Sequence, residues 1–150
     1  GMYSMTTHIG FGFLTGALPS GRKLNDPLGN GISPYAGSDR KGLTAAMRSV
    51  TKIDHSLYSN GLAYTVSLSP AFFSGNEGME KLVSLIEAYI KLGGMHIHFN
   101  VVDVNTLLDA QKNPEKYRDL LVRVAGYSAY FVDLTKDVQD EIIRRYLEES

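Results

Sequence analysis

The chain has 150 residues, of which 43% are hydrophobic and 21% are charged. This composition is typical of a globular domain and argues against disorder, a collagen-like helix or a disulfide scaffold. Fifteen basic and sixteen acidic residues leave a formal charge of −1, so we expect neither nucleic acid nor membrane as a partner. The chain has no cysteine, which excludes disulfides, thiolate metal sites and a cysteine nucleophile within it.

The location of the protein is inferred from what the sequence lacks. No apolar run approaches the roughly 20 residues that a membrane helix needs, and no segment resembles a signal peptide. We therefore expect a cytoplasmic protein. The opening Gly1-Met2 resembles a tag remnant in front of a start residue.

The front of the chain is rich in turn-forming residues. More than half of the 15 glycines lie between residues 10 and 42, a stretch without apolar periodicity. We expect a loop-rich segment over residues 1–40, followed by one structural unit over residues 41–150. Loops longer than about 12–15 residues are uncommon in compact domains, so this segment is functional, disordered or wrapped around a structure absent from the chain.

The remaining residues show alternating helical and strand periodicities. Helices are predicted over residues 43–50, 78–92, 103–112 and 135–147, with a further helical turn over residues 114–120. Strands are predicted over residues 62–68, 95–102, 121–124 and 129–132, and the strand over 95–102 is expected to be buried. Because strands alternate with helices, we expect an α/β fold with parallel strand pairing.

Residues 10–16, Gly-Phe-Gly-Phe-Leu-Thr-Gly, have a loose similarity to a dinucleotide-binding loop. That fingerprint needs an apolar strand before it and a helix after it, whereas Pro19 and Gly21 follow here. We therefore do not expect a dinucleotide site.

Two histidines, His96 and His98, share one face of the predicted strand, a spacing that metal sites can use. A metal site needs further ligands, and the remaining donors are His8, Asp54, His55 and Asp103. No spacing in the sequence brings these donors together, so two strand histidines with hydrogen-bonded rings are the simpler interpretation. A small metal-binding module using His96 and His98 is the alternative from another functional class.

The last candidate is a glycine within residues 122–131, Val-Arg-Val-Ala-Gly-Tyr-Ser-Ala-Tyr-Phe. Its position between two predicted strands indicates a turn glycine, Gly126, that needs a positive φ. Spacing alone assigns no chemistry to it.

Residues 122–131 resemble the glycyl-radical loop of the glycyl radical enzymes, the family of pyruvate formate-lyase and related dehydratases, lyases and decarboxylases. The resemblance covers nearly the whole chain. It extends to residues 19–22, 31–34, 37–39, 49–52, 93–102, 106–121 and 135–145. The chain is thus similar to the C-terminal region of such enzymes.

The resemblance implies a fold. The chain would be the C-terminal part of a ten-stranded α/β barrel, incomplete here, with a glycyl-radical hairpin loop and a C-terminal helix. Because 150 residues cannot close that barrel, we expect exposed strand edges and apolar surface, which favour homo-oligomers.

The resemblance also implies a site. Gly126 would carry a backbone radical at Cα, installed by a radical-SAM activating enzyme, with no other cofactor bound. Glycine suits this task because its Cα can flatten and share the unpaired electron with the adjoining amides. The supporting loop residues are Arg123, Val124, Ala125, Tyr127, Ser128, Tyr130 and Phe131. Val124 and the aromatic residues among them are expected to bury the loop against solvent and oxygen.

In the family the radical passes to a cysteine on a separate loop, and this chain has no cysteine. We therefore expect part of an acyltransferase, dehydratase or lyase that is inactive alone, with the cysteine in a missing N-terminal part or subunit. The sequence of residues 125–131 is more similar to the dehydratase and lyase members than to strict pyruvate formate-lyases. The alternative is a free-standing protein that resembles the autonomous glycyl radical cofactor.

Overall fold

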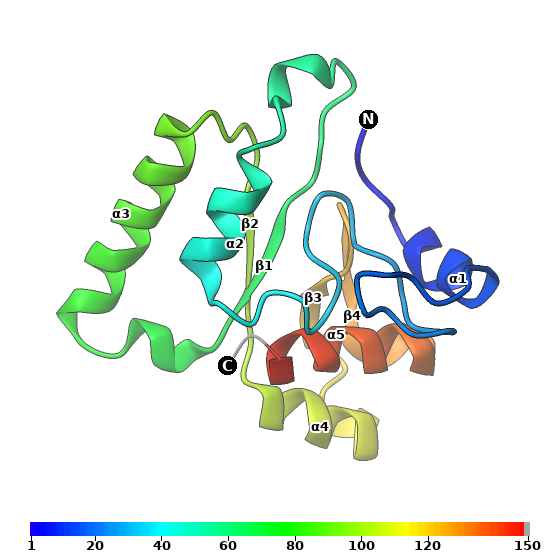
Figure 1. Cartoon of the computed structure of the whole chain (residues 1–150). Coiled ribbons are helices and arrows are strands. Elements are labelled where there is room, and N and C mark those ends of the chain that lie inside the picture. The colour runs from blue at the N-terminus through cyan, green and yellow to red at the C-terminus, as the bar shows by residue number, and fades with distance from the viewer. Residues whose placement is uncertain (149–150) are drawn as a thin grey trace.

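The structure is a computed structural model that describes residues 1–148 (Figure 1). Its α-helices are α1 (Thr7–Leu14), α2 (Leu43–Val50), α3 (Asn76–Lys91), α4 (Val104–Lys112) and α5 (Lys136–Glu148). Its strands are β1 (Thr65–Leu68), β2 (His98–Val101), β3 (Leu121–Arg123) and β4 (Ser128–Tyr130). These strands form two separate two-stranded sheets, β1–β2 and β3–β4.

The first sheet confirms the predicted parallel pairing. Thr65 on β1 lies opposite His98 on β2, and Leu68 lies opposite Val101. Helices α2 and α3 lie on the same side of this sheet (Figure 1). The core between them contains Met47, Val50, Tyr64, Val66, Leu68 and Tyr89.

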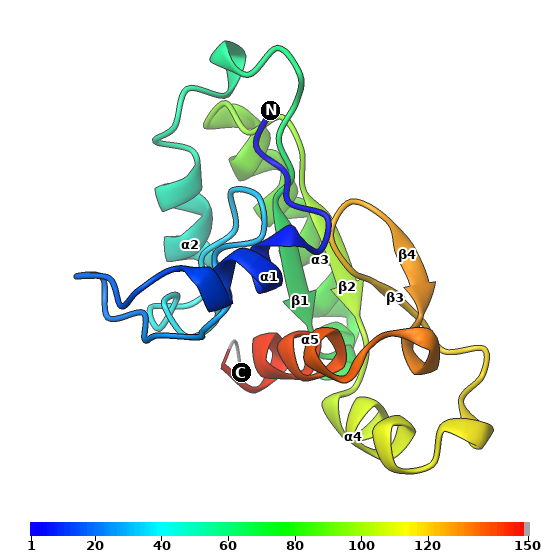
Figure 2. The ribbon, with the colours of Figure 1, turned by 90° about the vertical axis from the view of Figure 1, so that its right-hand side faces the viewer.

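A second core joins the C-terminal elements. Helices α4 and α5 pack with the β3–β4 hairpin around Leu107, Val122, Val124, Phe131 and Ile142. The helix predicted over residues 135–147 is confirmed as α5, and four apolar residues on one of its faces are all buried: Val138, Ile142, Ile143 and Tyr146. Figure 2 shows the hairpin beside β2, with α5 below it.

Several boundaries differ from the predicted ones. The helical turn expected over residues 114–120 is only the 3-10 turn Pro114–Lys116. The strand predicted over 129–132 ends at Tyr130, because Phe131–Asp133 forms another 3-10 turn. The prediction that β2 is a buried strand is wrong in part, since Asn100 is buried but Val101 is exposed.

Helix α1 lies inside the segment that we expected to be loop. Glycines at positions 10 and 12 have low helix propensity, so local sequence does not indicate this helix. Tertiary contacts explain it, because His8 and Ile9 are buried and Gly12 lies against the backbone of residues 26 and 27. A Cβ at Gly12 would collide with the carbonyl oxygen of Asp26.

The rest of the front segment folds around one buried cation. Arg22 is 2% exposed, and its guanidinium donates to the carbonyl oxygens of Gly12 over 2.6 Å and Gly16 over 2.8 Å. It also donates to the carbonyls of Thr15, Asp26 and Pro27. A long segment without apolar periodicity is thus organised by hydrogen bonds to a side chain.

Large apolar side chains are exposed on two helices. Phe11 and Leu14 on α1 are 57% and 81% exposed, and Val83 and Ile90 on α3 are 49% and 62% exposed. Exposed apolar side chains that lie together are typical of surfaces that contact other proteins, membranes or ligands. Within residues 1–148, no helix has the length and apolar character needed to cross a membrane.

Candidate functional site

The candidate site is the tip of the β3–β4 hairpin. The strands are antiparallel, with Arg123 opposite Ser128. The amide of Val124 donates to the carbonyl oxygen of Tyr127 over 2.9 Å. Ala125 and Gly126 are therefore the two central residues of a tight hairpin loop.

Gly126 has a φ of +85°, which confirms the predicted turn glycine. L-residues adopt this region only at an energetic cost. A Cβ at this position would have no heavy atom within 4 Å beyond its chain neighbours. The backbone conformation, rather than lack of space, therefore favours glycine here.

The hairpin tip is buried on one side only. Val124 and Phe131 are completely buried and Ala125 is 2% exposed, whereas Gly126 is exposed and Tyr130 is 48% exposed. The expected burial is thus wrong for Tyr130 and incomplete for Tyr127, which is half-buried. The reason is strand alternation, since Tyr130 lies on the face of β4 that turns away from the core.

A side-chain amide connects the hairpin to the first sheet. Asn100 on β2 is buried, and its Nδ2 donates to the carbonyl oxygen of Arg123 over 3.2 Å. Its Oδ1 accepts from the amide of Arg123 over 3.4 Å. The backbone carbonyl of Asn100 in turn accepts from the Tyr146 hydroxyl over 2.8 Å. The side-chain amide of Asn100 therefore pairs with both backbone groups of Arg123, as the backbone of a neighbouring strand would.

Two further side chains bind the next carbonyl of the hairpin. The carbonyl oxygen of Val124 accepts from Nδ2 of Asn30 over 3.1 Å and from Nη1 of Arg145 over 3.2 Å. Both donor residues are buried. The front segment and α5 thus meet at the residue two positions before Gly126.

Arg145 is itself fixed by a carboxylate one turn earlier on α5. Its Nε donates to Glu141 Oε1 over 2.7 Å, and its Nη2 bonds to Glu141 Oε2. His8 Nε2 lies 3.4 Å from Glu141 Oε1. Burial raises the pKa of the Glu141 carboxyl, but the Arg145 charge and the hydrogen bonds from His8 and Arg145 outweigh it and hold this pKa below its usual value. The carboxylate is therefore charged at neutral pH.

The predicted strand over residues 95–102 is shorter in the structure, so His96 lies just before β2 and His98 is the first residue of β2. Their rings stack with centroids 6.5 Å apart, and His96 Nδ1 accepts from the amide of Tyr64 over 3.3 Å. No group of three or more His, Cys, Asp or Glu side chains in residues 1–148 lies close enough together to hold a metal ion. Burial, together with the charges of Arg123 and His96, lowers the pKa of His98.

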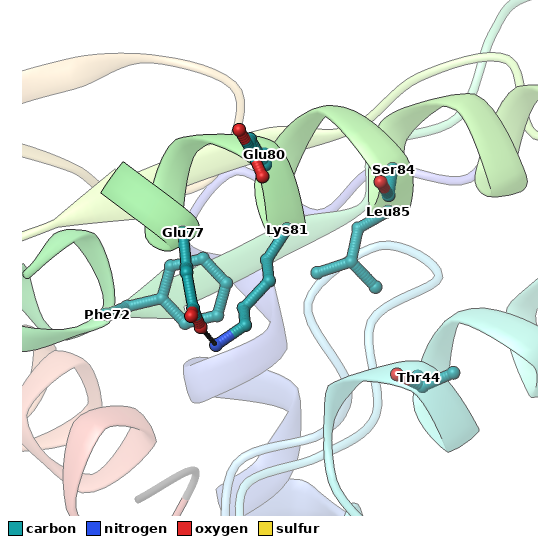
Figure 3. A pocket seen from close by; sticks show the side chains of 7 residues that line it. All are labelled: Thr44, Phe72, Glu77, Glu80, Lys81, Ser84 and Leu85. Atoms are coloured by element: carbon teal, nitrogen blue, oxygen red, sulfur yellow. Dashed lines mark hydrogen bonds and ion pairs between the residues drawn. The ribbon is translucent and has the colours of Figure 1, made fainter. Parts of the chain in front are cut away.

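A groove of about 690 Å³ separates α2 from α3 (Figure 3). It is lined by Thr44, Phe72, Glu77, Glu80, Lys81, Ser84 and Leu85. Its Glu77–Lys81 ion pair, with N and O atoms 3.0 Å apart, is solvent-exposed. No hairpin residue lines this groove, so it is not part of the candidate site.

The sequence indicated the hairpin but not its anchors. Asn30, Asn100, Glu141 and Arg145 were not among the expected site residues. Two local signals could have pointed to them: Asn100 interrupts an apolar strand, and Glu141 and Arg145 are spaced i, i+4 on the apolar face of a helix. Asn30 has no such signal, because its partner lies 94 residues away.

A glycine in left-handed conformation, at the tip of a hairpin docked on an α/β body, defines this site. The family model described as "Glycine radical" matches residues 28–132, which is most of the chain and includes the hairpin. The chain belongs to the glycyl radical family, as the resemblance predicted.

Individual relatives agree with this assignment. The chain is 45% identical over 144 residues to trans-4-hydroxy-L-proline dehydratase of Clostridioides difficile, covering 96% of this chain and 18% of the relative. It is 43% identical to the 4-hydroxyphenylacetate decarboxylase glycyl radical subunit of Clostridium scatologenes, covering 95% and 16%. The solved B12-independent glycerol dehydratase of Clostridium butyricum superposes with a TM-score of 0.93 at 50% identity, covering 97% and 18%. The chain thus spans less than a fifth of these relatives.

Proposed function

We propose that this chain is the radical-bearing C-terminal region of a glycyl radical enzyme of the dehydratase or lyase type, and that it stores the radical on Cα of Gly126. The observation that carries the proposal is the left-handed glycine at the hairpin tip, within the span that the family model matches. In this role the two short sheets are part of a larger barrel that the rest of the enzyme completes.

The geometry of the tip suits both formation and storage of the radical. Gly126 is exposed at the tip of the hairpin, so a radical-SAM activating enzyme can approach it there. Release of the hairpin from the domain would then let the Cα hydrogen enter the active site of that enzyme, where it is removed. Because Gly126 has no Cβ, the resulting carbon radical can become planar and share the electron with the two adjoining amides. The buried residues Val124 and Phe131 hold the base of the loop in place while the Cα of Gly126 becomes planar.

Use of the stored radical requires a thiol from outside this chain, which has no cysteine. We propose that Gly126 passes its oxidising equivalent to a cysteine in the rest of a longer enzyme or in a separate subunit. The thiyl radical formed there abstracts hydrogen from substrate. The dehydratases among the relatives favour elimination of water or a similar group as the reaction class.

Electron paramagnetic resonance tests the proposal. The chain is incubated without oxygen with S-adenosylmethionine, a reductant and an activating enzyme that generates the radical on a full-length dehydratase in a parallel reaction. We expect a doublet, because one α-hydrogen remains on the radical carbon, and its collapse when the protein is labelled with α-deuterated glycine. The proposal would be contradicted if the chain gave no signal while the full-length dehydratase in the parallel reaction did.

A further inference from the structure

We propose that Arg145 is a positioning residue for the radical hairpin: held by Glu141, its guanidinium clamps the Val124 carbonyl and sets how readily the hairpin leaves the body of the domain. This inference deepens the proposed function and rests on it for the meaning of the hairpin. The docking itself can be measured without any radical.

The hairpin depends on side chains because its sheet is not continuous with the first one. Strands β3 and β4 pair with each other, whereas β1 and β2 form a separate sheet. Asn100 donates to Arg123 on β3, and Asn30 and Arg145 donate to Val124, the residue that follows β3. Breaking such links weakens the docking of the hairpin, which then rests on its apolar contacts, and leaves the β1–β2 pairing in place. Local opening of the hairpin can therefore become easier than global unfolding.

Arg145 is the strongest of these links. Its hydrogen bond to Val124 is charge-assisted and buried, since Arg145 is only 8% exposed. The planar guanidinium has separate N–H groups for Glu141 and for the carbonyl, so the carboxylate fixes the direction in which Nη1 points. The two amide links are neutral and are expected to contribute less.

The clamp acts at the residue that closes the loop around Gly126. The amide of Val124 donates across the hairpin to Tyr127, and its carbonyl accepts from Arg145 and Asn30 on the other side. Both polar groups of Val124 are therefore fixed. The orientation of the Ala125–Gly126 peptide follows from them, because only two residues span the turn.

Hydrogen exchange of the whole chain tests the clamp, with Arg145→Lys as the variant. Lysine keeps a positive charge for Glu141 but loses the forked donor set. We expect amides in residues 121–131 to exchange about 10- to 100-fold faster, while amides in β1 and α4 keep their rates. Arg144→Lys is the matched control, because Arg144 is the exposed neighbour that pairs with Asp26 over 3.2 Å. It should leave the hairpin unchanged.

Two results would overturn the proposal. Unchanged exchange in the hairpin of Arg145→Lys would show that the clamp holds nothing. An equal rise in the hairpin, β1 and α4 would show a general structural role. If this variant does not fold, Asn30→Ala removes the other donor on the Val124 carbonyl, and we expect a local rise of about 3- to 10-fold. A global rise or no rise in Asn30→Ala would also overturn the proposal.

A radical readout separates this inference from the proposed function. Under activation, Arg145→Lys is expected to form the radical faster and lose it sooner than the unchanged chain, because the hairpin opens more often. Equal rates in both proteins would contradict the clamp. Absence of the radical from both would contradict the proposed function, while the exchange result would still decide the clamp.

Discussion

Replacing Gly126 with alanine is expected to abolish the radical and leave the fold in place. The loss follows because a Cβ opposes the planar radical centre between two amides. The fold survives because a Cβ meets open space, so the cost is the strain of a φ of +85°, about 1–2 kcal/mol. Anaerobic electron paramagnetic resonance and urea unfolding measure the two effects separately.

Gly61→Ala is the matched control for this variant. Gly61 has a φ of +79° and also has open space around a Cβ, but it lies in a different turn from the hairpin. We expect the same loss of stability and an unchanged radical signal. A radical in Gly126→Ala, or equal loss of the signal in both variants, would show that Gly126 is not the radical site.

Replacing Arg22 with methionine is expected to destabilise the chain by about 3–5 kcal/mol. The guanidinium donates to five backbone carbonyls between residues 12 and 27. Only the bond to Gly12 is fully buried, and an acceptor left there without a donor costs about 1–3 kcal/mol. The other four carbonyls are part-buried and can bind water instead, so each contributes less to the loss. The change is read from urea unfolding at neutral pH.

Arg40→Met provides the comparison for this effect. Arg40 donates to the carbonyl of Gly37 over 3.0 Å in the same part of the chain, but it is exposed. Its loss should change stability by less than about 0.5 kcal/mol. If the two variants lose similar stability, Arg22 does not organise the front segment. If Arg22→Met does not fold, Arg22→Lys is expected to fold with an intermediate loss.

The sequence predicted those elements in which the spacing of apolar residues matches the face that the element buries. The stripe of α5 around Ile142 is the clearest case, because every member faces the core. Helix α1 was missed because its stability comes from contacts of His8 and Gly12 with distant residues. Arg22 was missed as an organising centre because its partners are backbone carbonyls, which carry no sequence signal.

The candidate site likewise contains one residue that was predicted and others that were not. Gly126 was identified from the resemblance, and its positive φ from its place between two strands. The anchors Asn30 and Arg145 meet at Val124 only through tertiary structure, so no local pattern joins them. The exposure of Tyr130 was not foreseen, because the expected burial came from the resemblance and took no account of the face of β4 on which each side chain lies.

The most direct test of a radical on Gly126 is the position at which oxygen breaks the chain. The protein is activated without oxygen, exposed to air and measured by intact-mass spectrometry, with Gly126→Ala treated in parallel. We predict two new fragments that meet at Gly126, and none from the variant. An intact chain after air exposure, or cleavage at another residue, would contradict the assignment of the radical to Gly126.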